Sequence, residues 1–211
     1  MRAWLRWGLG LAVFAAVAGV PFCYYRASYA HAKRLRVVTP GKFYRSGQLT
    51  AEGFRDAHLR FGFKTVINLQ EEARDPLIPM TWRARPTVRE SELCKALGVR
   101  YVALDGGVLD DPNQDPGSRP RVIDDFLEIL DDPANYPVLI HCKAGLHRTG
   151  LMTAIYRMEY ECWPVDRAIR ELRANGFGTF AATDGNEYID RFVLKYERGV
   201  RRGRPVGGRC P

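Results

Sequence analysis

The stretch VLIHCKAGLHRTG, residues 138–150, decides the fold. Its first four residues follow a proline and predict a short buried strand over 138–141, and the residues from Thr149 onward predict a helix. Between the two lies a tight loop with a central glycine, Gly145. A strand, a sharp turn and a helix in this order indicate an α/β protein in which the loop lies at the carboxyl edge of a largely parallel sheet.

A loop in this position is suited to binding an anion. Its backbone N–H groups converge, and the N-terminus of the following helix adds the positive end of its dipole. Arg148, at the end of the loop, has a planar guanidinium that can hold two phosphate oxygens at once. Glycines at 145 and 150 are expected to permit positive φ angles and close backbone approach. The predicted phosphate-binding residues are Lys143, Ala144, Gly145, Leu146, His147 and Arg148.

Cys142 stands at the start of this loop, where it would face the phosphorus of a bound phosphate. A helix N-terminus and a nearby cation both favour the thiolate form of a cysteine. We therefore expect Cys142 to attack phosphorus and form a phosphocysteine intermediate. The Thr149 hydroxyl is predicted to hydrogen-bond the sulfur and stabilise it as a leaving group. Most isolated cysteines are inert core residues, but the complete Cys-x5-Arg-Thr-Gly pattern favours catalysis.

Residues 141–150 resemble the signature loop of the cysteine-based protein tyrosine phosphatases, most closely that of the dual-specificity branch. The resemblance covers roughly residues 37–196, and it implies hydrolysis of phosphate monoesters, a central sheet flanked by helices, and no metal or other cofactor. Three further segments agree with it in order: Tyr44-Arg45-Ser46-Gly47-Gln48, Val66-Ile67-Asn68-Leu69 and Leu104-Asp105-Gly106-Gly107.

The same family uses an aspartate to protonate the leaving oxygen, on a loop that follows the strand preceding the nucleophile's strand. Asp105 lies at the end of the predicted strand 100–104, and its Asp-Gly-Gly context is similar to the acid loop of kinase-associated and cell-division phosphatases. Asp110 and Asp111 lie nearer to the family's usual separation from the cysteine. The resemblance therefore implies Asp105 as the general acid, with Asp110 and Asp111 as alternatives.

The loop leaves the substrate class open between a phosphoprotein and a phosphoinositide or inositol polyphosphate. The Lys143-containing string is similar to the loop of tensin-like phosphoinositide phosphatases, although those enzymes carry another basic residue in place of Leu146. His147 before the arginine is similar to the plant and fungal atypical branch, which is linked to inositol polyphosphates. Lys143 and His147 could equally be solvent-exposed. A catalytically inactive phosphate-binding module is a further alternative, because a fold does not guarantee an activity.

The rest of the chain predicts an α/β domain over residues 37–196 with a central, mostly parallel sheet flanked by helices. Thr50 is a suitable N-cap for a helix over 51–61, and Gly62 is expected to end it. Residues 71–86 and 106–120 are predicted to be loops. The expected strands are 42–45, 64–69, 100–104 and 138–141, and the other expected helices are 88–97, 121–130, 149–161, 165–175 and 185–196.

Residues 1–30 are predicted to be a membrane anchor with basic flanks. An uncharged apolar run over residues 7–25, bounded by Arg6 and Arg26, has the length needed to cross a bilayer. A cleaved signal peptide is the alternative. Positive charges are slightly more numerous on the C-terminal side, which favours a single-pass membrane protein with its catalytic domain in the cytoplasm.

The formal net charge of +8 suits an anionic partner. Residues 197–211 are rich in arginine, glycine and proline and are predicted to be a disordered basic tail. Aromatic residues do not interleave these arginines, so the tail does not indicate nucleic-acid binding. The five cysteines lack paired short spacings, which argues against a disulfide framework and favours a reducing compartment.

Overall fold

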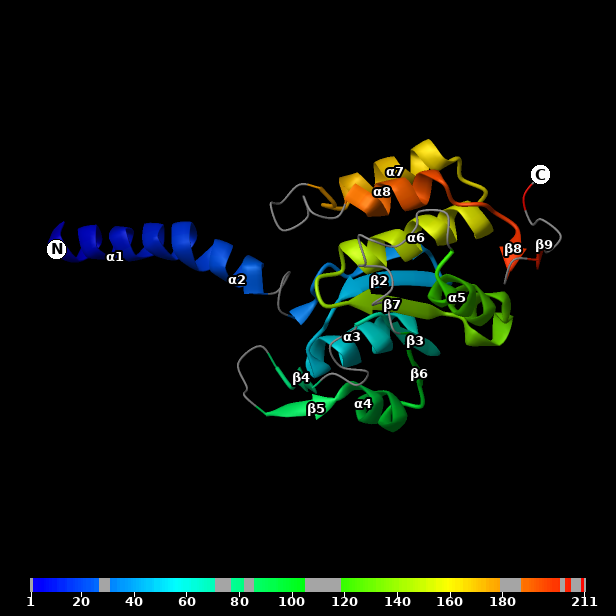
Figure 1. Ribbon diagram of the computed structural model, residues 1–211. Helices are drawn as coiled ribbons and strands as arrows, with labels where there is room; N and C mark the ends of the chain where they lie inside the picture. The colour runs from blue at the N-terminus through cyan, green and yellow to red at the C-terminus, as the bar shows by residue number, and fades with distance from the viewer. Residues whose placement is uncertain are drawn as a thin grey trace.

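The computed structural model describes residues 2–26, 31–70, 77–81, 86–104, 119–178, 187–201, 204–205 and 210. Its centre is a five-stranded sheet of order β1-β2-β7-β3-β6 (Figure 1). Strand β1 is antiparallel to β2, and the other three pairings are parallel, which confirms the predicted mostly parallel sheet. The strands are β1 Arg36–Thr39, β2 Phe43–Gly47, β3 Thr65–Asn68, β6 Arg100–Ala103 and β7 Val138–Cys142.

Helices cover both faces of this sheet. In Figure 1, α6 lies along one face with α7 and α8 outside it and α5 beside it, whereas α3 and α4 lie on the opposite face. The boundaries of α3 confirm the predicted signals, because the Thr50 side chain accepts a bond from Gly53 N and Gly62 ends the helix with a φ of 63°. The helices are α3 Ala51–Phe61, α4 Glu90–Ala96, α5 Arg121–Asp131, α6 His147–Tyr160, α7 Val165–Ala174 and α8 Glu187–Leu194.

Strand β7 supplies side chains to both halves of the core. Val138 and Ile140 pack in the cluster that contains the apolar faces of α5 and α6, and Leu139 points the other way into the cluster with α3 and α4. Helix α6 is buried along most of its length because it lies between the sheet and α7. This central strand and helix hold the loop between them at a fixed place on the sheet edge.

Three local features differ from the predictions. Strand β1 was not expected, because this edge strand buries only Val38 and so lacks an apolar alternation. A small hairpin, β4 Leu77–Pro79 with β5 Thr87–Arg89, lies partly within the predicted loop and buries Ile78. Helix α6 begins at His147, two residues earlier than predicted. His147 and Arg148, which were predicted to end the polar loop, belong to the first helical turn.

The C-terminal region also differs from the predicted disordered tail. Strands β8 Val200–Arg201 and β9 Arg204–Pro205 form an antiparallel pair. Arg201 Nε lies 3.0 Å from Asp131 Oδ2, so an ion pair joins the tail to α5.

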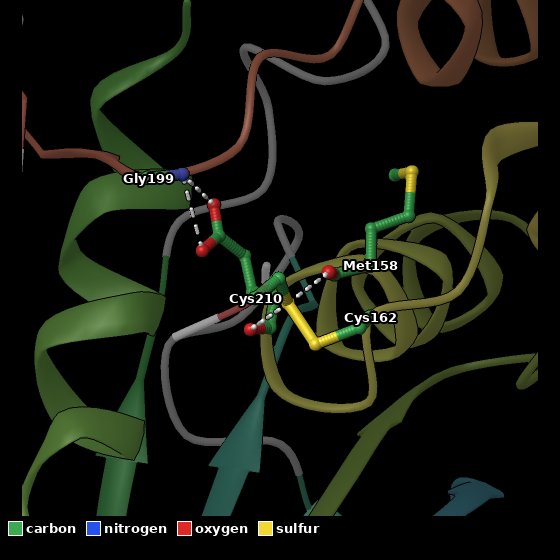
Figure 2. Close-up of a disulfide and its surroundings, with 5 residues drawn as sticks. Met158, Cys162, Gly199 and Cys210 are labelled. Atoms are coloured by element: carbon green, nitrogen blue, oxygen red, sulfur yellow. Dashed lines mark hydrogen bonds between the residues drawn. A yellow bond between two sulfur atoms is a disulfide. The ribbon is translucent and has the colours of Figure 1, made fainter. Parts of the chain in front are cut away.

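A disulfide between Cys162 and Cys210 holds the tail at the end of α6 (Figure 2). Beside it, Gly199 N donates to Glu159 Oε1 at 3.0 Å. The sequence argued only against a disulfide framework, and this single bond was not predicted, because the two cysteines are 48 residues apart and only the fold brings them together.

The N-terminal segment forms helix α1 Arg2–Phe14, a π-helical turn Ala15–Gly19 and helix α2 Val20–Arg26, and it stands apart from the domain (Figure 1). Within it, Arg6–Tyr25 is a candidate membrane span of 20 residues with a mean hydropathy of 1.7. A signal sequence near the N-terminus can have this length and composition as well.

Candidate active site

The site is built on the junction between β7 and α6. Cys142 is the last residue of β7, and it lies in register opposite Gly47, the last residue of the parallel strand β2. The thiol is 6% exposed. The next four residues form a loop, and α6 begins at His147. The cysteine therefore occupies the carboxyl edge of the sheet, as the sequence predicted.

Hydrogen bonds from outside the loop hold three of its carbonyl groups. One donor is the backbone N–H that follows β2, and the other two are arginine guanidinium groups. Each bond fixes the plane of one peptide, so together they determine the path of the loop. The pairs are Gln48 N to Lys143 O at 3.3 Å, Arg34 Nη1 to Ala144 O at 2.9 Å and Arg45 Nη2 to Gly145 O at 2.8 Å.

These three bonds also determine the direction of the loop's amides. In a trans peptide the C=O and the following N–H point in opposite directions. Since the carbonyls of residues 143–145 are held by groups outside the loop, the N–H groups of residues 144–146 face the other way. Gly145 N donates to Cys142 Sγ at 3.2 Å, which shows that this amide points at the sulfur. These amides thus face away from the groups that hold the carbonyls, and one of them points at the thiol, which is the kind of backbone arrangement that binds anions.

Gly145 is required by this geometry. Its φ is +73°, and a Cβ placed there would lie 2.5 Å from Gly47 N and 2.7 Å from the carbonyl carbon and oxygen of Ser46. The predicted positive φ and close approach are therefore both confirmed at this position. Gly150 differs, because it is an ordinary helical residue of α6. There the absence of a side chain makes room for Leu172 Cδ1, which would lie 2.5 Å from an added Cβ.

Arg148 and Thr149 lie in the first turn of α6. Arg148 Nη1 donates to Leu69 O at 3.0 Å, just past the end of β3, so the guanidinium reaches across the edge of the sheet. The Thr149 hydroxyl is fully buried and has no hydrogen-bond partner among the described residues. The predicted bond from this hydroxyl to Cys142 Sγ is thus not made in this structure.

The other predicted loop residues divide by exposure. Leu146 is buried, Ala144 is half-buried, and the side chain of Lys143 is exposed. His147 packs edge-on against the Phe177 ring, with 5.9 Å between the ring centroids. The contact with Phe177 therefore sets the position of the His147 ring, whereas the Lys143 side chain is exposed.

The three candidate acids, Asp105, Asp110 and Asp111, lie outside the described residues. The described strand β6 ends at Ala103 and is followed by Leu104, at the same carboxyl edge as Cys142 because β6 and β7 are both parallel to β3. The assignment of the acid remains a prediction.

Comparison with known proteins identifies the family. A family model described as "DSP-PTPase phosphatase fused to NAD+ Kinase" matches residues 12–187. The chain belongs to this DSP-PTPase family. The predicted membership of the cysteine-based phosphatase superfamily, dual-specificity branch, is thereby confirmed.

Relatives with curated names match this DSP-PTPase over part of their length. The dual specificity protein phosphatase TpbA of Pseudomonas aeruginosa is 48% identical over 42 residues, which are 20% of this chain and 19% of TpbA. The inositol diphosphatase SIW14 of Saccharomyces cerevisiae is 27% identical over 156 residues, 72% of this chain and 48% of SIW14. The matches thus cover about a fifth and about half of these two relatives.

Solved structures show the same fold. The Siw14 catalytic core superposes with a TM-score of 0.58 at 22% identity, covering 79% of this chain and 86% of that one. The predicted α/β architecture of the DSP-PTPase is therefore confirmed by its own sheet and by this neighbour.

Sequence reasoning missed the residues that hold the loop of this DSP-PTPase from outside. Arg45 is 3% exposed, and burial lowers its pKa to about 10, while the charge of Glu171 opposes that shift. An arginine inside the predicted strand 42–45 was the available signal. His141 and Glu90 form a second unpredicted contact, since Nε2 and Oε1 of these two buried side chains lie 3.0 Å apart. This contact ties the end of β7 to the start of α4.

Proposed function

We propose that this DSP-PTPase hydrolyses phosphate monoesters through a phosphocysteine intermediate on Cys142. The observation that carries the proposal is the direction of the loop amides, shown by the bond from Gly145 N to Cys142 Sγ. Such donors bind the phosphate oxygens and stabilise the charge that they carry in the transition state. The thiol is therefore placed next to the phosphorus of any phosphate that the loop binds.

The reaction has two displacements. In the first, Cys142 Sγ attacks phosphorus, the S–P bond forms, and the ester P–O bond breaks as the leaving oxygen takes a proton from the general acid. In the second, the same group accepts a proton from water, the water oxygen attacks phosphorus, and the S–P bond breaks to release inorganic phosphate and the thiolate. Arg148 holds two phosphate oxygens, and its bond to Leu69 O orients the guanidinium for this role.

The remaining catalytic roles follow the sequence predictions. We assign the general acid to Asp105, with Asp110 and Asp111 as alternatives, and a role in sulfur stabilisation to Thr149, whose hydroxyl is buried near the start of α6. If Asp105 is the acid, Asp105→Asn slows hydrolysis of an alkyl phosphate far more than that of an activated aryl phosphate, whose leaving group needs less protonation. If Asp110→Asn or Asp111→Asn instead slows the alkyl phosphate more than the aryl phosphate, and Asp105→Asn does not, that residue would be the general acid.

The proposal is tested by hydrolysis of an aryl phosphate by the full chain in detergent. Cys142→Ser should abolish turnover, because a hydroxyl is a far weaker nucleophile than a thiolate at neutral pH. Cys23→Ser is the matched control, since Cys23 is a free, exposed cysteine on α2. Full activity in Cys142→Ser would contradict the proposal, and a wild-type chain that binds phosphate without hydrolysing any ester would support the inactive phosphate-binding module.

Two substrate classes follow from the relatives' names, phosphoproteins from TpbA and inositol phosphates from SIW14. We propose a phosphorylated protein as the first candidate and an inositol phosphate or phosphoinositide as the second. The second candidate is supported by two cations, Lys143 within the loop and Arg34 bonded to it from outside. A panel of phosphotyrosine peptides, inositol polyphosphates and phosphoinositide micelles distinguishes them by kcat/KM.

The disulfide supports a revised location. We propose that α1 and α2 anchor the chain in a membrane or direct its export, and that the catalytic domain lies on the oxidising side rather than in the cytoplasm. Disulfides persist in oxidising compartments and are rare in the cytosol, and Cys162–Cys210 is such a bond. Maleimide labelling in cells should modify Cys162 and Cys210 only after reduction. Equal labelling without a reductant would restore the cytoplasmic prediction.

A further inference from the structure

Residues 31–35, which precede β1, contact the end of β2 and the phosphate loop. Gly47 N donates to Lys33 O at 2.7 Å, and Arg34 Nη1 donates to Ala144 O at 2.9 Å. Two successive residues of this segment are therefore bonded to the end of β2 and to the phosphate loop.

The Lys33 side chain packs over Gly47, at the same edge of the sheet as Cys142. A Cβ added to Gly47 would lie 2.9 Å from both Cγ and Cδ of Lys33, so the lysine stem occupies the space over this glycine. Gly47 is the register partner of Cys142. Neighbouring strands are about 4.8 Å apart, and the stem of a lysine is long enough to bring the ammonium group alongside the thiol and the loop.

The charged groups that act on Lys33 are two cations and Cys142. Among the described residues, Lys33 has no carboxylate partner, and its charged neighbours are Arg34, Lys143 and Cys142. Burial lowers the pKa of Lys33, the positive charges of Arg34 and Lys143 lower it further, and Cys142 opposes them. A half-buried ammonium among other cations is stabilised when an anion occupies the space between them.

We propose that Lys33 forms a second anion subsite beside the phosphate loop, which binds a second phosphate adjacent to the one that Cys142 attacks. The subsite rests on the proposed function, because its second phosphate lies beside the one that Cys142 attacks. It predicts that the preferred substrate carries two neighbouring phosphates. The loop amides and Arg148 hold the phosphate that reacts. The ammonium of Lys33 holds the second.

The experiment measures binding and so does not depend on turnover. Inorganic phosphate and inorganic pyrophosphate are titrated by calorimetry into the full chain in detergent, in the Cys142→Ser background that blocks phosphoryl transfer. Lys33→Met keeps an unbranched stem over Gly47 and removes the charge, and Lys33→Arg restores the charge. Lys42→Met is the matched control, because Lys42 is exposed and precedes the opposite end of β2.

Lys33→Met should weaken pyrophosphate binding about tenfold more than phosphate binding, the size of a lost charge-assisted hydrogen bond. Lys33→Arg should recover most of that difference, and Lys42→Met should leave both affinities unchanged. Equal weakening of the two ligands would overturn the subsite, since Lys33 would then only support the loop. Unchanged binding of both would overturn it as well. Failure of the aryl phosphate assay would instead overturn the phosphatase proposal and leave this test intact.

Discussion

Replacing Gly145 by alanine tests the geometry of the phosphate loop. The new Cβ would lie 2.5 Å from Gly47 N and 2.7 Å from the Ser46 carbonyl, both backbone atoms of β2. A flexible side chain could move away from such a contact, but a strand inside the sheet cannot. The loop must therefore shift, and the amide of residue 145 then loses its direction toward Cys142 Sγ.

The expected loss in the free energy of unfolding has two parts. An alanine at a positive φ costs about 1–2 kcal/mol, and insertion of a methyl group into a closely packed site adds about 1–3 kcal/mol. Gly62→Ala isolates the first part, because Gly62 has a φ of +63° and nothing within 4 Å of the added Cβ. Gly145→Ala should thus lower the free energy of unfolding by about 1–3 kcal/mol more than Gly62→Ala.

Urea unfolding followed by circular dichroism measures the stability of both variants, and aryl phosphate hydrolysis measures their activity. Gly145→Ala should lose about a hundredfold in kcat, the usual effect of removing one preorganised donor. Gly62→Ala, remote from the loop, should keep the wild-type rate. Equal stability losses together with equal rates in the two variants would refute the close approach of the loop to β2.

Three further variants test individual contacts. Arg45→Met removes the donor to Gly145 O and should lower the free energy of unfolding by about 1–3 kcal/mol, and kcat with it, in the same two assays. Glu90→Ala removes the buried carboxylate that lies 3.0 Å from His141 Nε2 and should cost about 1–3 kcal/mol in urea unfolding. Cys210→Ser opens a disulfide that spans 48 residues and should cost about 2–4 kcal/mol, seen as a lower Tm.

Each of these variants has a matched control. Arg121→Met removes an exposed arginine, and Glu92→Ala removes an exposed carboxylate from the same helix as Glu90, so both should be near neutral. Reduction of the wild-type chain should reproduce the Tm of Cys210→Ser. A control that costs as much as its partner, or a reduced wild type with an unchanged Tm, would show that the named contact does not stabilise the fold.

The sequence predicted what depends on local chemistry. The strand, loop and helix around Cys142 were identifiable because β-prone residues, a glycine and a helical pattern follow one another without interruption. Thr50 and Gly62 likewise marked the ends of α3, since a cap and a left-handed glycine act within a few residues. Gly145 was identifiable for the same reason.

Contacts between distant segments were not predictable. Arg34 and Arg45 hold the loop from residues about a hundred positions away, a relation that depends on β2 lying beside β7. The pairing of Cys162 with Cys210 depends on the path of the C-terminal segment, and sequence spacing carries no record of it. Gly150 shows the limit within the motif itself, because its role is set by Leu172 on another helix.

The central claim is that Cys142 carries the phosphoryl group during turnover. The most direct measurement is to quench the full chain in acid during hydrolysis of an aryl phosphate and to find the modified residue by mass spectrometry. We expect a phosphoryl group on Cys142, which accumulates when breakdown of the intermediate is slowed by Asp105→Asn and is absent in Cys142→Ser. Turnover with no phosphorylated cysteine, or with the phosphoryl group on another residue, would contradict it.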